Sequence, residues 1–551
     1  MLHIPELDQM VCLQLSPHDL AQCAQVCKKW WSIVTPHIWG DLSWLCSTTG
    51  PHEQLGAFYK MVLEDYYNRD GQRKSQRAKR NTKQPSPRSP ILSKYGHMIR
   101  TLPGPGDPSD DWSTLRRGVT RRQKVLEAAE LFIHLINHCS PDVQVSLLTV
   151  YFEDMAPSAH HPRRTVLGLT LPRVRHLSIA VDCYSRNLKT STLVALLDQC
   201  STILERLEIN AVAVYKDEMD RQVEERAESE PKCFLSLKEL ILHECVNMYD
   251  SDTKAFWPWL WKRCGRVEKI VVDSFPETAQ SLAQSMLAYM PNLSEITLGK
   301  YWVITESIPD DMNATLLSGS RNGWKVVRVG PHACFERTAM NALTTHFSTL
   351  GVVEIRGSDD LIEVLRSCTN LHTLAITDVD LKEGHEQFPF SAEAFIDPCH
   401  DTASLKAWDC EASLRVLKIS ITGIPRQDRQ DQQNRRVKSI FIGQGREMQK
   451  RVYERLARLV NLETLSLGST HRNWLGTSLG SGLEKLSGLK KMKEFDVGAM
   501  EILQLGAKEA RWMAEQWPRV RTLGRFCRTA DMEEAVVWLR MHYPNIKMRL
   551  W

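Results

Sequence analysis

The hexapeptide LKELIL, from Leu237 to Leu242, carries apolar residues at its first, fourth and sixth positions. The same spacing occurs in twelve hexapeptides, and their central apolar residues mostly recur at steps of about 20 to 30 residues. A recurrence of this length is typical of repeat proteins, in which each repeat is one supersecondary unit. The twelve hexapeptides begin at Val145, Val174, Leu204, Leu237, Val267, Leu293, Trp324, Leu350, Leu371, Leu414, Leu462 and Met492.

Helical patterns separate the hexapeptides. Ala279–Leu293 and Lys450–Leu462 have apolar residues at helical spacing, and each runs into the next hexapeptide. One strand and one helix cannot close a core, but stacked repeats would place Leu240 beside Leu207 and Ile270 in continuous apolar rows. The pattern therefore predicts a curved α/β repeat solenoid. A doubly wound α/β domain is disfavoured because the chain lacks a glycine-rich phosphate turn.

The first forty residues predict three short helices. Pro5 suits the first turn of one helix, and Ser16 can cap a second helix that has Pro17 and Asp19 in its first turn. A third helix contains Trp30. A unit of about forty residues buries too little apolar surface to be stable alone, so we expect it to have a partner.

These residues resemble the F-box motif. The resemblance rests on the apolar-proline start Ile4-Pro5, on the Leu-Ser-Pro-x-Asp-Leu junction at 15–20, and on Val-Cys-Lys-Lys-Trp at 26–30. In the F-box family this motif docks onto a Skp-family adaptor, which bridges to the cullin and RING-type subunits of a ubiquitin ligase. The resemblance implies adaptor contacts at Ile4, Pro5, Leu15, Leu20, Val26 and Trp30. The alternative is a set of three helices that only caps the rest of the chain.

Motif and repeats together resemble F-box proteins with irregular leucine-rich repeats, an arrangement expanded in fungi. This resemblance implies a leucine-rich-repeat-like horseshoe with an N-terminal three-helix F-box. It also implies a receptor without enzymatic activity, the substrate-recognition subunit of a Skp-cullin-F-box ubiquitin ligase, which binds a protein target through its repeats. The alternative is a scaffold or nuclear protein-interaction module with no role in ubiquitin transfer.

Three parts are expected along the chain: an F-box at 1–42, a helical segment with a basic linker at 43–94, and the solenoid at 95–551. The linker, about residues 69–90, is rich in Lys, Arg, Ser and Pro and has no hydrophobic periodicity. A nuclear localisation signal and a solvated loop are equally compatible with it. A second polar stretch, near 425–447, is expected to be an insertion in one repeat.

The composition narrows the classes of partner. The chain has 551 residues and a net charge of +4, so global charge does not draw it to nucleic acid or membranes. No apolar run reaches the roughly 18 residues of a membrane span, and the first residues lack the features of a signal peptide. We therefore expect a cytoplasmic or nuclear protein. Its fifteen cysteines include no C-x-x-C pair and are expected to be thiols.

No pattern predicts catalysis, a cofactor or a metal site. GTSLG at 476–480 fits the G-x-S-x-G nucleophile elbow at Ser478, but no strand pattern directly precedes it, which disfavours a hydrolase. His160 and His161 have no suitably spaced companion for a metal ion. The tryptophans of FWPWLWKRC at 256–264 are expected to pack a repeat helix and not to stack on nucleobases.

Along each strand, side chains point alternately into the buried rows and outward, and the target is expected to bind the outward-pointing face. Ile241 and Val271 would then be neighbours on adjacent strands and form an exposed apolar pair rimmed by charge. The mixed charges of this face disfavour a nucleic-acid groove. The side chains that we assign to this target-binding face are Glu239, Ile241, His243, Lys269, Val271 and Asp273.

Overall fold

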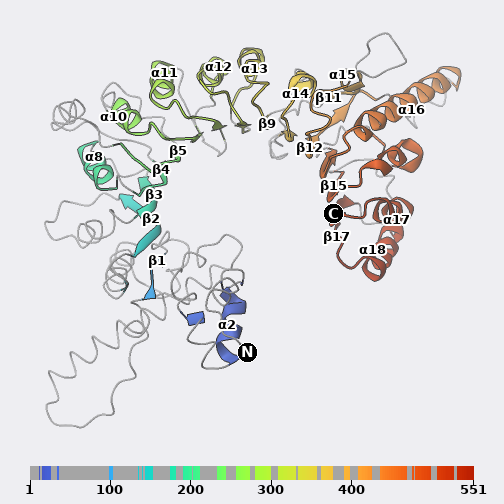
Figure 1. The fold of residues 1–551 in the computed structure, drawn as a ribbon. Coiled ribbons are helices and arrows are strands. Elements are labelled where there is room, and N and C mark those ends of the chain that lie inside the picture. Colours follow the sequence, from blue (N-terminus) through green and yellow to red (C-terminus); the bar gives the residue numbers. More distant parts are fainter. Residues whose placement is uncertain are drawn as a thin grey trace, which may run out of the picture. The chain divides into compact units, whose positions relative to one another are not determined.

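Two compact units divide the chain, Met1–Val267 and Glu268–Trp551. In both, helices alternate along the chain with strands of a parallel sheet (Figure 1). The expected basic linker at 69–90 lies outside the residues that the computed structural model describes. The described residues are 12, 15, 17–26, 34–35, 98–102, 135, 139, 143–152, 174–181, 190–200, 203–210, 233–243, 256–273, 280–299, 308–330, 333–355, 361–376, 390–396, 407–424, 435–467, 475–476, 478–497, 506–526 and 530–550.

In the first unit, each described strand pairs in parallel with the next one along the chain. The strands are β1 (Thr101–Leu102), β2 (Gln144–Phe152), β3 (Val174–Val181), β4 (Arg206–Asn210) and β5 (Glu239–His243). The helices are α2 (Pro17–Val26), α8 (Thr190–Gln199) and α10 (Phe256–Arg263). This order, in which each strand neighbours its predecessor, is that of stacked repeats.

The second unit continues the same parallel pairing. Its main strands are β6 (Lys269–Val272), β7 (Glu295–Leu298), β8 (Val326–Val329), β9 (Val352–Ile355), β10 (Thr373–Ile376), β12 (Val416–Ile419), β14 (Thr464–Leu467), β15 (Glu494–Asp496), β16 (Thr522–Phe526) and β17 (Lys547–Leu550). A separate parallel pair consists of β11 (Phe390–Ser391) and β13 (Ile421–Thr422). The α-helices are α11 (Gln280–Tyr289), α12 (Asp310–Ser318), α13 (Arg337–Thr344), α14 (Leu361–Ser367), α15 (Ala392–Ile396), α16 (Arg435–Ala457), α17 (Ala507–Gln516) and α18 (Ala530–His542), and the 3-10 helices are η9 (Leu479–Ser481) and η10 (Leu483–Gly488).

Strand register aligns the central apolar residues of neighbouring repeats. In the first unit Leu177 pairs with Leu207, and Leu207 with Leu240. All these side chains are at most 1% exposed, and a fully buried leucine contributes about 1.5–3 kcal/mol. The rows confirm the predicted α/β repeat solenoid. In the second unit the row consists of Ile270, Ile296, Val327, Val353, Leu374, Leu417, Leu465, Phe495 and Leu523.

All twelve hexapeptides contain strand residues, but β1, β11, β13, β16 and β17 are not predicted by the pattern. In β16 the third apolar position is taken by Arg525, so the spacing that identifies the other strands is broken. In β17 apolar residues alternate at Ile546, Met548 and Leu550, which is a strand pattern without the hexapeptide spacing. The solenoid therefore extends further toward Trp551 than the twelve hexapeptides do.

The polar stretch near 425–447, expected as an insertion in one repeat, is described by the structure only from Arg435 onward, and its role as an insertion stays a prediction. From Arg435 onward it is helical and forms the first half of α16. Arg, Lys, Gln and Glu are good helix formers, so low hydrophobicity here does not mean a loop. Among the residues of α16 whose burial is described, 445–457, the buried apolar side chains are Val452, Tyr453 and Leu456.

A buried cation ties α16 to the turn before β12. The Arg455 side chain is fully buried, 3.5 Å from the Glu411 carboxylate, and its guanidinium lies 4.7 Å from the centre of the Trp408 ring. Glu411 also pairs with Arg458 at 3.1 Å. Removing one partner of a buried ion pair typically costs about 3–5 kcal/mol, because the other charge stays buried. This group of side chains therefore fixes α16 against its own repeat.

Adjacent repeats are also joined on their helical side. The Asp310 carboxylate, at the start of α12, accepts hydrogen bonds from the backbone nitrogens of Glu336, Thr338 and Ala339 at 2.7, 3.0 and 3.3 Å. These nitrogens belong to the N-terminal turn of α13, where they have no acceptor within the helix. A carboxylate at this end also complements the helix dipole. Asp310 thus caps the helix of the next repeat.

We predict that Asp310→Ala lowers the free energy of unfolding by about 1–2 kcal/mol, because three amides of α13 lose their cap. Urea unfolding followed by circular dichroism measures the change. Asp311→Ala is the matched control, since Asp311 is exposed in the same turn of α12 and should cost less than about 0.5 kcal/mol. Equal losses in the two variants would contradict the role of Asp310 as a cap between repeats.

Candidate functional site

Within the first unit, the helices expected at residues 1–42, here called the N-terminal unit, have their own small core around α2. Leu20, Cys23 and Ala24 follow one another at helical spacing and lie on the inner face of α2, while Gln22 and Gln25 are exposed. Pro17 begins the helix and Asp19 lies in its first turn, as the sequence predicts. The core consists of Cys12, Leu20, Ala24 and Val34, with Leu15 and Cys23 packed against it.

Of the six side chains expected to contact an adaptor, Leu20 is 6% exposed and packs in this core, and Leu15 is partly buried against it. These two therefore support the unit from within. Val26 is the last residue of α2. Ile4, Pro5 and Trp30 lie outside the described residues. Adaptor contact at these positions stays a prediction.

The strand face of β4 and β5 carries a group of paired charges. Arg206 lies 3.3 Å from Glu208 and 3.6 Å from Glu239, and His243 lies 3.1 Å from Glu208. The His243 hydrogen bond is the main reason that the pKa of the Glu208 carboxyl is below its usual value; burial opposes this shift and Arg206 adds to it. Opposite charges therefore neutralise one another on this face.

The expected exposed apolar pair is absent from this face. Ile241 is 4% exposed and Val271 is 5% exposed, so the prediction that both side chains face solvent is wrong. Neighbouring side chains on a parallel ladder stand about 5 Å apart and cover one another. Ile241 lies in register with Glu208, and Val271 lies in register with Thr297, which is itself 5% exposed.

The other side chains assigned to target binding differ in exposure. Asp273 is 1% exposed, so it cannot offer a charge to a partner in this conformation. Glu239, His243 and Lys269 are half-buried and keep part of their surface. Their contact with a target stays a prediction.

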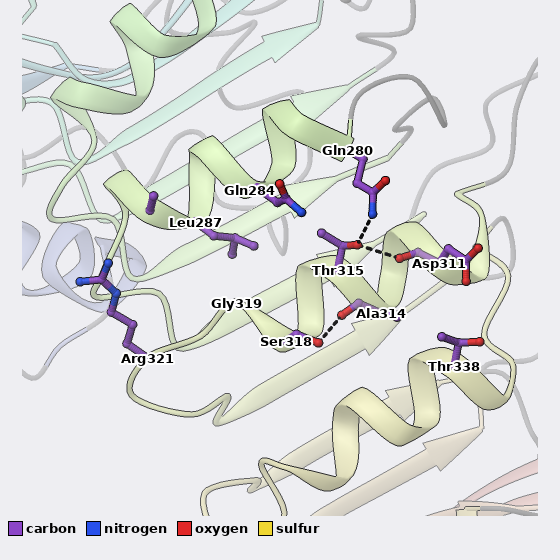
Figure 2. A pocket seen from close by; sticks show the side chains of 11 residues that line it. Gln280, Gln284, Leu287, Asp311, Ala314, Thr315, Ser318, Gly319, Arg321 and Thr338 are labelled. Carbon is purple, nitrogen blue, oxygen red and sulfur yellow. Dashed lines mark hydrogen bonds between the residues drawn. The ribbon is translucent and has the colours of Figure 1, made fainter.

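A groove of about 670 Å³ lies on the helical side of the second unit, between α11 and α12 and reaching Thr338 of α13 (Figure 2). Gln280 donates a hydrogen bond to the Thr315 hydroxyl at 3.3 Å, and Thr315 donates to the Asp311 carbonyl oxygen at 2.9 Å. The lining holds a single carboxylate, Asp311, and no nucleophile paired with a base. The groove therefore carries no catalytic arrangement.

Gly319 at the wall of this groove allows α11 and α12 to approach closely. A Cβ at this position would lie 2.2 Å from Leu287 Cδ1 and 2.8 Å from Cγ, so a larger residue would push the Leu287 side chain aside. A glycine at this position thus permits the close packing of the two neighbouring repeat helices.

The other sequence features behave as structural parts. Ser478 directly precedes the 3-10 helix η9, and its hydroxyl is hydrogen-bonded to that of Ser481 at 2.8 Å, so no nucleophile elbow forms. Gly482, between η9 and η10, has a φ of 116°, which favours glycine. His160 and His161 lie outside the described residues. Within the described ranges, no group of three His, Cys, Asp or Glu side chains could hold a metal ion.

The tryptophans of α10 are buried, as the sequence predicts. Trp257 stacks on Trp261 with ring centroids 4.9 Å apart, and the Arg263 guanidinium lies 3.9 Å above the Trp259 ring. Arg263 also pairs with Asp198 of α8 at 3.6 Å. These rings fill the repeat core and are not available to stack on a nucleobase.

Among the described helices, none is long and apolar enough to cross a membrane.

Comparison with known proteins identifies one segment. Residues 5–43 match the family model described as F-box-like, which confirms the resemblance to the F-box motif. No curated protein matches the chain. Among solved structures, the chain is similar to one from yeast titled "Crystal structure of Rad7 and Elc1 complex in yeast"; the two are 13% identical, the match covers 73% of this chain and 80% of that chain, and the TM-score is 0.37.

The pairing of Glu208 with His243 predicts a pH-dependent stability. Because the folded chain lowers the pKa of Glu208, the carboxylate stabilises the fold above its unfolded pKa of about 4.3, and this contribution is lost as the pH falls through the folded value. At pH 7, Glu208→Gln should lower the free energy of unfolding by less than about 1 kcal/mol, since the pair is partly exposed.

Urea unfolding at a series of pH values checks this expectation. The difference between the wild type and Glu208→Gln should shrink toward zero between about pH 5 and pH 3. Adding His243→Gln to this variant should change little further, because the bond is already lost. A difference that stays constant over this pH range would show that the Glu208 carboxylate does not stabilise the strand face.

Proposed function

We propose that this protein is the substrate-recognition subunit of a Skp-cullin-F-box ubiquitin ligase. The observation that carries the proposal is the F-box-like match at residues 5–43, which contains α2 and its separate core. Behind this segment follow stacked repeats, which offer long sheet and helix faces. A docking unit joined to an extended binding surface suits a protein that connects a target to other subunits.

The proposed mechanism is positioning. The N-terminal unit holds the Skp-family adaptor, and the cullin and the RING-type subunit assemble through that adaptor. The repeats hold the target, which raises the concentration of its lysines near the ubiquitin carrier. In this mechanism no step of bond making falls to this chain, and the transfer of ubiquitin is left to the other subunits.

The proposed adaptor surface consists of Ile4, Pro5, Val26 and Trp30, with Leu15 and Leu20 supporting it from the core of the unit. A small unit that buries its remaining apolar residues against a partner gains stability from binding. For the target, the half-buried polar side chains Glu239, His243 and Lys269 are proposed contacts on the strands.

Capture of a recombinant Skp-family adaptor by the full chain tests the proposal. We predict that Pro5→Ala combined with Trp30→Ala weakens adaptor binding at least thirtyfold, about 2 kcal/mol, because large apolar anchors dominate such interfaces. Biolayer interferometry with immobilised adaptor measures the affinity. Undiminished affinity of the double variant would exclude this surface.

The matched control is Val537→Ala with Met541→Ala. These apolar side chains of α18 are 55% and 68% exposed, so the control also removes apolar surface from the chain, but in the second unit. Its adaptor affinity should equal that of the wild type. A wild-type chain that captures no adaptor would favour the scaffold alternative, in which the helices only cap the repeats.

A further inference from the structure

A ladder of charged residues runs along one edge of the sheet in the last repeats of the second unit. Each member donates its backbone N–H to the carbonyl oxygen of the member before it, at 2.7–2.8 Å. The first four stand immediately before β12, β14, β15 and β16, and the fifth opens β17. Strands paired in this way lie about 4.8 Å apart. In order, the members are Arg415, Glu463, Lys493, Arg521 and Lys547.

One carboxylate in this ladder is surrounded by cations. Glu463 accepts a hydrogen bond from Lys493 at 2.5 Å, and this bond is the main reason that the pKa of its carboxyl is below the usual value. Burial opposes this lowering of the pKa, and the charges of Lys493, Arg415 and Lys491 add to it. The single acid of the ladder is therefore already neutralised within it.

Further along, the positive charge is unbalanced. Arg519, Arg521 and Lys547 are exposed and form no ion pair with any described residue. Lys491 is also exposed and donates only to the neutral Asn461 side chain, at 2.6 Å. Like charges on neighbouring strands repel one another, so an incoming anion would be stabilised by several cations at once.

The corresponding positions of the first unit lack this excess. Arg175, Glu205 and Lys238 occupy the same edge there and are linked by the same backbone hydrogen bonds, at 2.7 and 2.8 Å. Their charges alternate in sign, and Arg175 pairs with Glu205 at 3.8 Å. The repeat architecture therefore does not require the run of cations, which is a property of the last repeats.

We propose that this basic edge, defined as Arg415, Lys491, Lys493, Arg519, Arg521 and Lys547, binds an acidic polypeptide segment, rich in Asp and Glu, of the target protein. The proposal deepens the proposed function, on which it rests, by naming the chemistry of the target. Arginine side chains bind carboxylates through paired N–H donors, and lysine adds point charges. Flexible Asp and Glu side chains can each reach one of the separated cations, such as Arg519, Arg521 and Lys547.

Nucleic acid fits the basic edge less well. Proteins that hold duplex DNA through its backbone often neutralise about six to ten phosphates. Lys493 of the basic edge is already hydrogen-bonded to Glu463. The cations left for phosphates are therefore Arg415, Lys491, Arg519, Arg521 and Lys547. Single strands are usually held by stacking on aromatic rings, and the basic edge contains none.

The test uses the full chain bound to the recombinant adaptor. The probe is a fluorescein-labelled peptide of about twelve Glu and Asp residues, with a Gln and Asn peptide of equal length as the uncharged comparison. Fluorescence anisotropy should show saturable binding of the acidic peptide that weakens as salt is raised. Arg519→Glu, Arg521→Glu and Lys547→Glu together should weaken it at least tenfold, and the three Gln replacements by less.

The matched control reverses three exposed cations on the helical side, in Lys450→Glu, Lys508→Glu and Arg540→Glu. It makes the same change in net charge and should keep most of the affinity, while circular dichroism verifies that both triple variants are folded. Equal losses in the two triple variants would overturn the proposal, because global charge would then explain the binding. Tighter binding of a twelve-base-pair DNA duplex at the same salt concentration would also overturn it.

Adaptor capture separates this proposal from the proposed function. A chain that holds the adaptor but shows no acidic-peptide binding would overturn the basic edge and leave the receptor assignment intact. A chain that binds the acidic peptide at this edge but captures no adaptor would support the edge and overturn the ligase assignment.

Discussion

No repeat of this protein can bury its own apolar strand residues, and this constraint governs the rest of the structure. Leu207 is fully buried because Leu177 and Leu240 flank it in register, and Leu465 is buried between Leu417 and Phe495 in the same way. Each strand therefore depends on its neighbours for both hydrogen bonds and burial. As a consequence, side chains that are distant in sequence lie in register on successive strands, at the regular spacing of the sheet.

The links between repeats combine apolar rows with polar contacts. Asp310 caps a helix of the following repeat, whereas Arg455 acts within one repeat and holds α16 against the turn that leads into β12. Arg263 joins α10 to α8 through Asp198 and also lies over the Trp259 ring of its own helix. Buried charges of this kind add little net stability but are costly to break, so they favour a single arrangement of helix and strand. A fixed arrangement keeps the surface side chains at constant separations, as a recognition surface requires.

The same architecture presents different surfaces along its length. On β4 and β5 the pairs Arg206–Glu239 and Glu208–His243 leave little net charge, whereas the last repeats carry consecutive cations at one edge. The N-terminal unit is separate from both in its chemistry, because its core is built from small and aliphatic residues around α2. Under the proposed function, adaptor binding and target binding would therefore depend on different side chains. A receptor that holds two partners at once needs such a division.

The repeat architecture and the N-terminal helix α2 are readable in the sequence, because apolar spacing and capping residues act over a few neighbouring positions. Strands β16 and β17 escape the pattern where Arg525 and a strictly alternating stretch replace its apolar positions. The burial of Ile241, the pairing of Glu208 with His243 and the gathering of Arg415, Lys493 and Arg521 at one edge depend on strand register. Register is decided by contacts between repeats that are far apart along the chain, so only the tertiary structure specifies it.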